Sequence, residues 1–82
     1  MKIHLLQASS CADDEHDIRN YPRSSFKSKP ELPAGTRLSV KEKWQNFYGR
    51  YYRCYLPDEM KDKGYSIPWY DIPADKAKVI EL

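Results

Sequence analysis

Hydrophobic and polar positions alternate along three short stretches of the chain, which is the pattern of strands with one buried face. The stretches are residues 2–7, 37–41 and 50–56. In the last two, the alternation predicts a β-hairpin with one face toward the core and the other toward water. The predicted inner face carries Leu38, Val40, Tyr52, Cys54 and Leu56, and the predicted outer face carries Arg37, Lys41, Tyr51, Arg53 and Tyr55.

Turn and breaker residues predict the connections between these stretches. Gly49 can supply a positive backbone angle for a hairpin connection at residues 46–49. Residues 57–64 are expected to form a second turn. Residues 65–70 are expected to form a short strand at a sheet edge or a bulge, because Pro68 cannot donate a ladder hydrogen bond. The C-terminal stretch predicts one short 3-10 turn around residues 73–76 and a closing strand at residues 78–82.

The aromatic-rich segment also allows a second interpretation, a helix over residues 39–56. Its large apolar residues recur at intervals of three and four, and Ser39 with Glu42 has the spacing of a capping box. Against the helix, Gly49 costs about 1 kcal/mol relative to alanine, and Trp, Phe and Tyr favour strands. The sheet is therefore the main prediction, and an α+β fold with this helix is the alternative.

The N-terminal part of the chain shows no comparable pattern. Residues 8–31 are mostly Ser, Asp, Arg, Lys and Pro, and they are expected to form a long irregular or partly disordered loop. A chain of 82 residues can build one small core. We therefore expect a single small domain over residues 1–82 that is mainly β, with about five strands.

The C-terminal part contains three motifs in a recognisable order: the turn and strand "ELPAGTRLSV", the aromatic-rich hairpin, and "DIPADKAKVIEL". This order resembles a Src-homology-3-like barrel over residues 32–82, with Ile72 and Pro73 anchoring that family's single helical turn. The resemblance implies a small barrel. It also implies binding, because such domains commonly hold peptides or other proteins across a groove of aromatic residues, and some hold nucleic acid. The tyrosine-rich first strand of proline-binding members is missing near residues 3–9, so a proline ligand is not expected.

Charge and composition limit the expected partners and cellular compartment of the protein. The formal net charge of +2 is too small to draw the whole chain toward nucleic acid or anionic lipid. No stretch approaches the roughly 18 apolar residues of a membrane span, and the apolar part of "MKIHLLQASSC" is too short for the leader that it resembles. With two cysteines only, we expect a cytoplasmic protein with reduced thiols and no membrane partner.

Candidate chemistry is sparse. His4, Cys11, His16 and Cys54 carry metal-binding atoms, but their spacing does not match that of structural zinc sites. Cys54 is expected to be a small buried residue, and the other three to be exposed. Cys11 and His16 lie in one charged tract, without the rigid scaffold that normally holds a nucleophile next to its base. The three glycines lie too far apart in the sequence to form a phosphate-binding loop. We predict no enzyme, metal, cofactor or small-molecule substrate.

The outer face of the predicted hairpin is the main functional candidate. Tyr, Trp and Arg dominate the hot spots of protein interfaces, and rings interleaved with cations also stack bases and neutralise phosphates. The slight net charge favours a protein partner, and nucleic acid is the alternative; simple packing of tyrosines over arginine stems is a third interpretation. The expected partner-binding residues are Trp44, Tyr48, Tyr51, Arg53, Tyr55, Trp69 and Tyr70. The nucleic-acid alternative would use Arg37, Lys41, Arg50 and Arg53.

Overall fold

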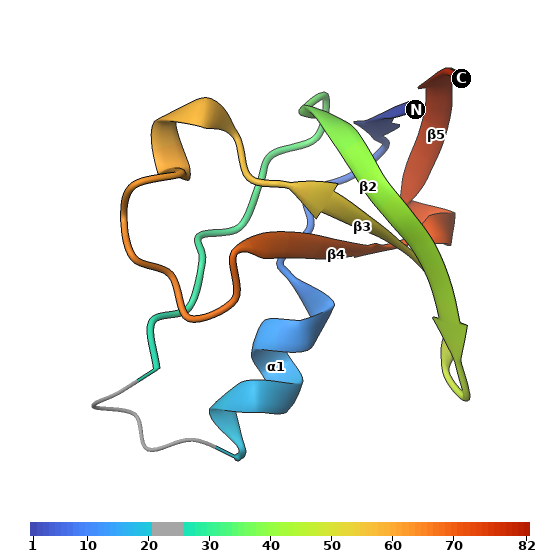
Figure 1. Ribbon diagram of the computed structural model, residues 1–82. Helices are drawn as coiled ribbons and strands as arrows, with labels where there is room; N and C mark the ends of the chain where they lie inside the picture. Colours follow the sequence, from blue (N-terminus) through green and yellow to red (C-terminus); the bar gives the residue numbers. More distant parts are fainter. Residues whose placement is uncertain (21–25) are drawn as a thin grey trace.

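A single antiparallel sheet organises the chain. The computed structural model describes residues 1–20 and 26–82, and its five strands lie in the order β4-β3-β2-β1-β5 (Figure 1). The prediction of a mainly β fold with about five strands is confirmed. The strands are β1 (Lys2–Leu5), β2 (Arg37–Asn46), β3 (Gly49–Tyr55), β4 (Trp69–Pro73) and β5 (Ala77–Glu81).

The aromatic-rich segment is a β-hairpin, so the alternative helix over residues 39–56 is wrong. β2 and β3 pair as far as Asn46 and Gly49, and Phe47 and Tyr48 form the connection. The side-chain oxygen of Asn46 accepts the backbone N–H of Tyr48 at 2.8 Å. Gly49 has a φ of 142°, a conformation that L side chains rarely adopt. The hairpin projects beyond the rest of the sheet (Figure 1).

The C-terminal elements follow the predicted order. The 3-10 turn η2 (Ala74–Lys76) leads from β4 into β5, and β5 pairs with β1. β4 begins at Trp69, so Pro68 lies just outside the strand, and β4 is an edge of the sheet. A second 3-10 turn, η1 (Asp58–Met60), lies within the segment predicted as a turn.

The N-terminal tract contains a helix, which corrects the expectation of an irregular loop across residues 8–31. Ala12–Ile18 form α1, which lies against β4 (Figure 1). Three acidic residues occupy its first turn, where carboxylates interact favourably with the helix dipole. Residues 21–25 of this tract lie outside the described residues. No helix in the described ranges has the length and apolar character that crossing a membrane requires.

A buried ion pair attaches the end of this tract to α1. Lys29 Nζ lies 2.8 Å from Asp14 Oδ1 and donates to the carbonyl oxygen of Ile67 at 2.8 Å, and the Lys29 side chain is 0% exposed. The backbone N–H of Lys29 also donates to Asp14 Oδ2 at 2.9 Å. A β-bridge between Ser9 and Leu32 joins the two ends of the tract. These contacts hold α1 and the tract against the sheet.

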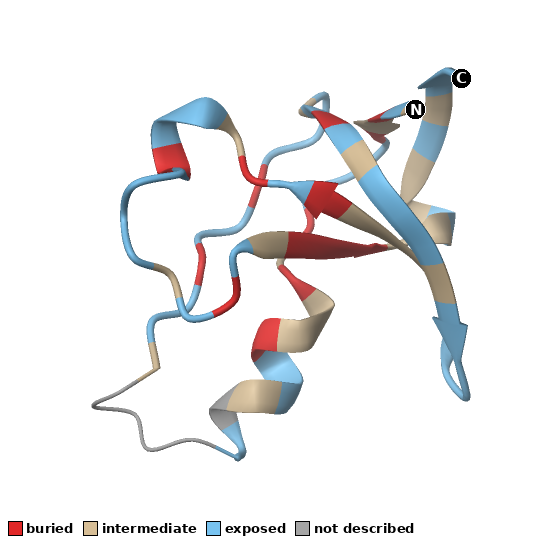
Figure 2. Ribbon diagram, in the orientation of Figure 1, coloured by how far each residue is buried: buried red, intermediate tan, exposed pale blue. Residues whose placement is uncertain are grey.

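The core confirms the predicted inner face of the hairpin. Leu38, Cys54 and Leu56 are buried, and Val40 and Tyr52 pack against them. Burial is concentrated in β4 and the adjoining end of β3, whereas the far end of the hairpin is exposed (Figure 2). The remaining core residues come from the other elements: Ile3, Leu5, Cys11, Leu32, Met60, Tyr70 and Ile72.

Candidate functional site

A β-bulge at Lys41 determines which side chains of β2 join the outer face of β3. The register shifts there, so that Glu42 pairs with Arg53 and Trp44 with Tyr51. Directly paired residues lie on the same face of an antiparallel sheet. Strict alternation from the buried Leu38 would place Trp44 on the inner face. The extra residue instead turns Trp44 outward, beside Tyr51 and Arg53.

Five outer-face side chains form a stack across β2, β3 and β4. The rings of Tyr51 and Trp44 are stacked, with centroids 4.5 Å apart and an interplanar angle of 16°. Arg53 Cζ lies 5.4 Å from the ring centroid of Trp44 and 4.5 Å from that of Trp69. Lys41 Nζ lies 5.6 Å from the Trp69 ring. Each cation therefore lies over an aromatic face, which attracts it electrostatically. We call these five side chains the ring–cation stack.

Asp71 connects the members of the stack through hydrogen bonds. Asp71 is 0% exposed. Its Oδ1 accepts hydrogen bonds from Trp44 Nε1 at 2.8 Å and from Arg53 Nε at 3.0 Å. Oδ2 accepts Trp69 Nε1–H at 2.9 Å and Arg53 Nη2–H at 3.2 Å. Burial opposes ionisation of this carboxyl, but hydrogen bonds with Asp13, Arg53 and Trp44 outweigh it and lower the pKa of Asp71. The rings and Arg53 are thus fixed to one buried anion.

Asp13 brings a second carboxyl group from α1 to the same cluster. Its Oδ2 accepts hydrogen bonds from Arg53 Nη2 and from Trp69 Nε1, each at 3.2 Å. Burial, followed by a hydrogen bond to Asp71, raises the pKa of Asp13 from 3.8 to about 6. Asp13 therefore keeps its proton to a higher pH than an exposed aspartate does. Through this residue the helix is attached to the ring–cation stack.

Arg53 is almost entirely occupied by contacts within the protein. In addition to Asp71 and Asp13, its Nη1 donates to Glu42 Oε1 at 3.3 Å, and its side chain is 23% exposed. The hydrogen bond to Asp71, followed by the nearby carboxylates, raises the pKa of Arg53. Its charge is balanced internally, so Arg53 positions the rings more than it offers a free cation to a partner.

The ring–cation stack ends at Tyr51, beside a groove between α1 and the hairpin. The rings of Trp44, Tyr48 and Tyr51 line this hollow of about 390 Å³. The other lining residues are Ala12, Asp13, Glu15, His16, Arg19 and Asn46. We call this hollow the aromatic groove. A second hollow of about 510 Å³ shares Tyr48 and Tyr51 and extends the surface toward η2.

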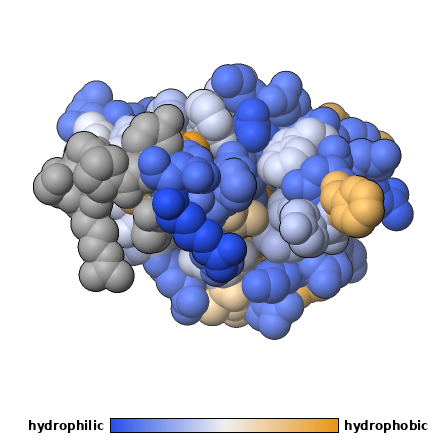
Figure 3. All heavy atoms as spheres, turned by 90° about the horizontal axis from the view of Figure 1, so that it is seen from below, coloured by the Kyte–Doolittle hydropathy of each residue, from blue (hydrophilic) through white to orange (hydrophobic). Residues whose placement is uncertain are grey.

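The tip of the hairpin leaves two aromatic side chains in solvent. Phe47 is 100% exposed and Tyr48 is 87% exposed, and their rings meet edge to face with centroids 6.4 Å apart. The molecule seen from below is mostly hydrophilic, and hydrophobic residues form only isolated spots on it (Figure 3). Rings exposed to this degree contribute nothing to the core, which makes Phe47 and Tyr48 candidate contact groups.

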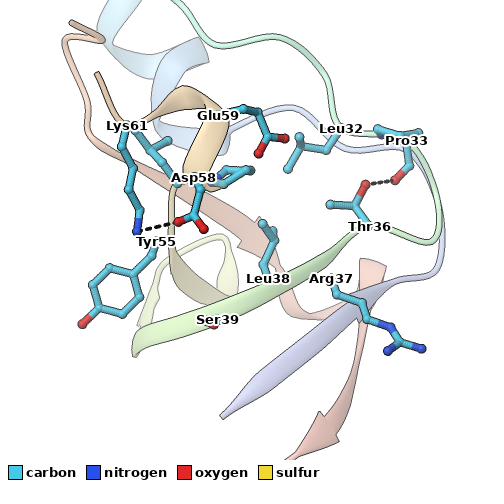
Figure 4. A pocket seen from close by; sticks show the side chains of 12 residues that line it. Leu32, Pro33, Thr36, Arg37, Leu38, Ser39, Tyr55, Asp58, Glu59 and Lys61 are labelled. Atoms are coloured by element: carbon cyan, nitrogen blue, oxygen red, sulfur yellow. Dashed lines mark hydrogen bonds and ion pairs between the residues drawn. The ribbon is translucent and has the colours of Figure 1, made fainter. Parts of the chain in front are cut away.

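Two residues expected at the partner surface lie elsewhere. Tyr70 is fully buried, its hydroxyl donates to the carbonyl oxygen of Pro30 at 2.7 Å, and burial raises its pKa. Tyr70 is a core residue, and its expected role in partner contact is wrong. Tyr55 is half-exposed, but it lines a different hollow together with Arg37 (Figure 4).

The four basic residues of the nucleic-acid alternative do not form one continuous track. Arg37 lines the hollow at the start of β2, and Arg50 lies beside Tyr51 toward η2. Lys41 lies over the Trp69 ring, and Arg53 is enclosed by carboxylates. Lys41 and Arg53 therefore share the Trp69 ring, whereas Arg37 and Arg50 lie on other parts of the sheet.

The two cysteines are structural. Cys11, expected to be exposed, is fully buried, and its thiol donates to the Trp69 carbonyl oxygen at 3.7 Å and accepts the Asp71 N–H at 3.2 Å. It thus occupies backbone groups on the open edge of β4. Burial raises the pKa of Cys11 to about 11 and that of Cys54 to about 12. Across residues 1–20 and 26–82, no cluster of three or more His, Cys, Asp or Glu side chains could hold a metal ion.

Three residues important for this surface were absent from the predicted set: Asp13, Phe47 and Asp71. Asp71 carried a signal, because aspartate is depleted in strands and here it stands between two large apolar residues. Phe47 had the same local pattern as Tyr48, which was included. Asp13 carried no distinguishing signal within its acidic tract.

Comparisons with protein-family models, with curated proteins and with solved structures each found no match.

Proposed function

We propose that the chain is a non-enzymatic binding module that holds a segment of a partner protein in the aromatic groove. The observation that carries the proposal is the fixed position of Tyr51 and Trp44 in the ring–cation stack, next to the exposed ring of Tyr48. Rings that are already ordered lose little conformational entropy on binding, and Tyr and Trp are the residue types that dominate interface hot spots.

The arrangement of the strands supports the resemblance to Src-homology-3-like barrels from which this function was expected. The hairpin of β2 and β3, and the short turn η2 between β4 and β5, correspond to elements that the sequence motifs implied. Fold alone does not determine function. The resemblance therefore adds to the proposal, and the aromatic groove remains its basis. The two buried free thiols agree with a reducing compartment, for which we propose the cytoplasm.

The charges around the groove favour a protein over nucleic acid. Asp13 and Glu15 line the groove on the α1 side and would repel phosphate groups. Among the described residues, Arg19 is the one arginine that lines it. Arg53, shared by both hypotheses, already contacts three carboxylates. A nucleic-acid site would need several cations along one track.

Site-specific photo-crosslinking tests the proposal. A benzophenone amino acid at position 48, introduced in cells that make the full chain, should give adducts with a discrete protein. The same group at position 82, where Leu82 is 96% exposed at the far edge of the sheet, is the control and should give none. Adducts with nucleic acid at position 48 would favour the alternative, and equal adducts at both positions would contradict the proposal.

A further inference from the structure

A further hollow lies away from the aromatic groove, between the start of β2 and the segment that follows β3. It measures about 830 Å³, within the range of about 300–1,000 Å³ typical of ligand clefts. Its apolar floor is formed by Leu32, Leu38 and Leu56, which are at most 7% exposed. Leu38 points from β2 toward Leu32 across the hollow (Figure 4). We call this hollow the Leu38 groove.

One side of β2 has no strand partner along this groove. Arg37, Leu38 and Ser39 pair with β1, but the ladder between β2 and β3 begins only at Val40. Continuing that register would place Pro57 opposite Arg37. Proline has no N–H and cannot extend the ladder, so the chain turns away there into η1. The divergence of the two strands opens the Leu38 groove.

Backbone groups of β2 point into this opening. The N–H of Leu5 donates to Thr36 O, and the N–H of Val40 donates to Met1 O, each toward β1. Backbone groups of alternate residues in a strand point to opposite sides. Those of Arg37 therefore face the groove, where they offer hydrogen bonds to an added strand. The carbonyl of Ser39 faces Tyr55 of β3, next to the pair of Val40 and Cys54, so the open stretch of the edge is centred on Arg37.

The groove is lined by the acidic residues Asp58 and Glu59 and by the basic residues Arg37 and Lys61. Asp58 and Lys61 form an ion pair at 2.9 Å on the rim, which balances both charges. The carboxyl group of Glu59 points toward Leu32 across the hollow, whereas the Arg37 side chain points away from it (Figure 4). No ion pair of Glu59 occurs within the described residues. A basic side chain is the complement that this opening lacks.

We propose that the Leu38 groove binds an extended segment of a partner polypeptide, which pairs with the open edge of β2 at Arg37. One apolar side chain of the segment packs on Leu38, and a neighbouring lysine or arginine pairs with Glu59. Main-chain hydrogen bonds supply affinity in this mode of recognition, and the alternate side chains supply specificity. This surface is independent of the aromatic groove.

The proposal can be tested with random short peptides displayed on phage and selected against the full chain. Synthetic copies of the enriched peptides are then examined by amide hydrogen exchange. The exchange of the Arg37 amide should slow at least about tenfold. The Leu38 amide, which faces β1, should change little and is the internal control. N-methylation of the peptide backbone at the paired positions should abolish binding.

A matched pair of substitutions tests the charge. E59Q should weaken binding of the enriched peptides about two- to fivefold, as expected for one partly exposed ion pair, whereas E15Q at the aromatic groove should not. The inference is overturned if no peptide is enriched, if N-methylated peptides bind equally well, or if protection appears only around Tyr48 and Tyr51. The last result would still support the proposed function, so the two proposals are distinguishable.

Discussion

At the scale of single residues, Asp71 determines the geometry of the candidate surface. One buried carboxylate accepts hydrogen bonds from Trp44, Trp69 and Arg53, which come from three different strands. A buried anion is tolerated because its charge is compensated by Arg53 and its oxygens are hydrogen-bonded. The positions of the rings that face the partner thus depend on a residue that the partner does not touch.

Replacing Asp71 with asparagine should destabilise the fold by about 2–4 kcal/mol, because Arg53 loses its most buried counter-ion. The measurement is the free energy of unfolding from urea denaturation. Asp75→Asn changes an exposed carboxylate in the neighbouring turn and should stay within about 0.5 kcal/mol of wild type. Similar losses for the two variants would show that Asp71 has no special role.

The raised pKa of Asp13 predicts that the stability of the fold depends on pH. Its pKa is raised from 3.8 to about 6, so the folded chain holds this proton more tightly than the unfolded chain. The resulting stabilisation is complete below pH 3.8 and is lost as the pH rises through about 6. Relative to Asp13→Asn, the wild-type free energy of unfolding should fall across this window in urea titrations. A constant or rising difference would contradict the assigned environment.

Residue-level prediction succeeded where alternation alone decides the outcome. Tyr51 and Arg53 face outward while Cys54 is buried, as the period of two in β3 requires. The contact between Asp13 and Trp69 joins residues 56 positions apart. No local pattern encodes such a pair, so the self-contained network around Arg53 could not be foreseen.

At the scale of elements, the hydrophobic pattern of the sequence predicted neither the bulge in β2 nor the helix α1. A bulge shifts the register by one residue, and the residue types around Lys41 do not indicate one. α1 has seven residues, which is too short for a helical period to emerge, and a helix of this length is marginal in isolation. Tertiary contacts must therefore stabilise it, and the most buried of them is the pair of Asp14 and Lys29.

Asp14→Asn should destabilise the protein by about 3 kcal/mol, because it leaves the Lys29 ammonium buried without its counter-ion. Unfolding by urea measures the loss, and hydrogen exchange should show faster opening of α1. Asp58→Asn removes the carboxylate of an ion pair in which both side chains are largely exposed, and should leave the unfolding midpoint almost unchanged. Equal midpoints for the two variants would mean that the buried pair does not hold α1.

At the scale of the whole molecule, the outer surface combines internal packing with contact groups. The third interpretation, self-packing of rings and cations, describes Arg53 and Trp69 well. It does not describe Phe47 and Tyr48, whose side chains are almost fully exposed to solvent. The cations that could attract phosphate are distributed across the molecule, and the net charge is only +2.

Weak binding of oligonucleotides follows from this distribution of charge. Fluorescence anisotropy with single-stranded and duplex probes at two salt concentrations should show little binding even at low salt. Tight binding at low salt that falls steeply at high salt would require a continuous phosphate track. That result would replace the protein-binding proposal with the nucleic-acid alternative.

The central claim is that the aromatic groove contacts a protein partner, and the affinity of Tyr48→Ala for the protein crosslinked at position 48 tests it most directly. Because Tyr48 is 87% exposed, the melting temperature should not change. The dissociation constant, measured by calorimetry, should rise at least about tenfold, or about 1.4 kcal/mol. Ile80→Ala, at the far edge of the sheet, should bind as wild type does. An unchanged dissociation constant for Tyr48→Ala would contradict the account.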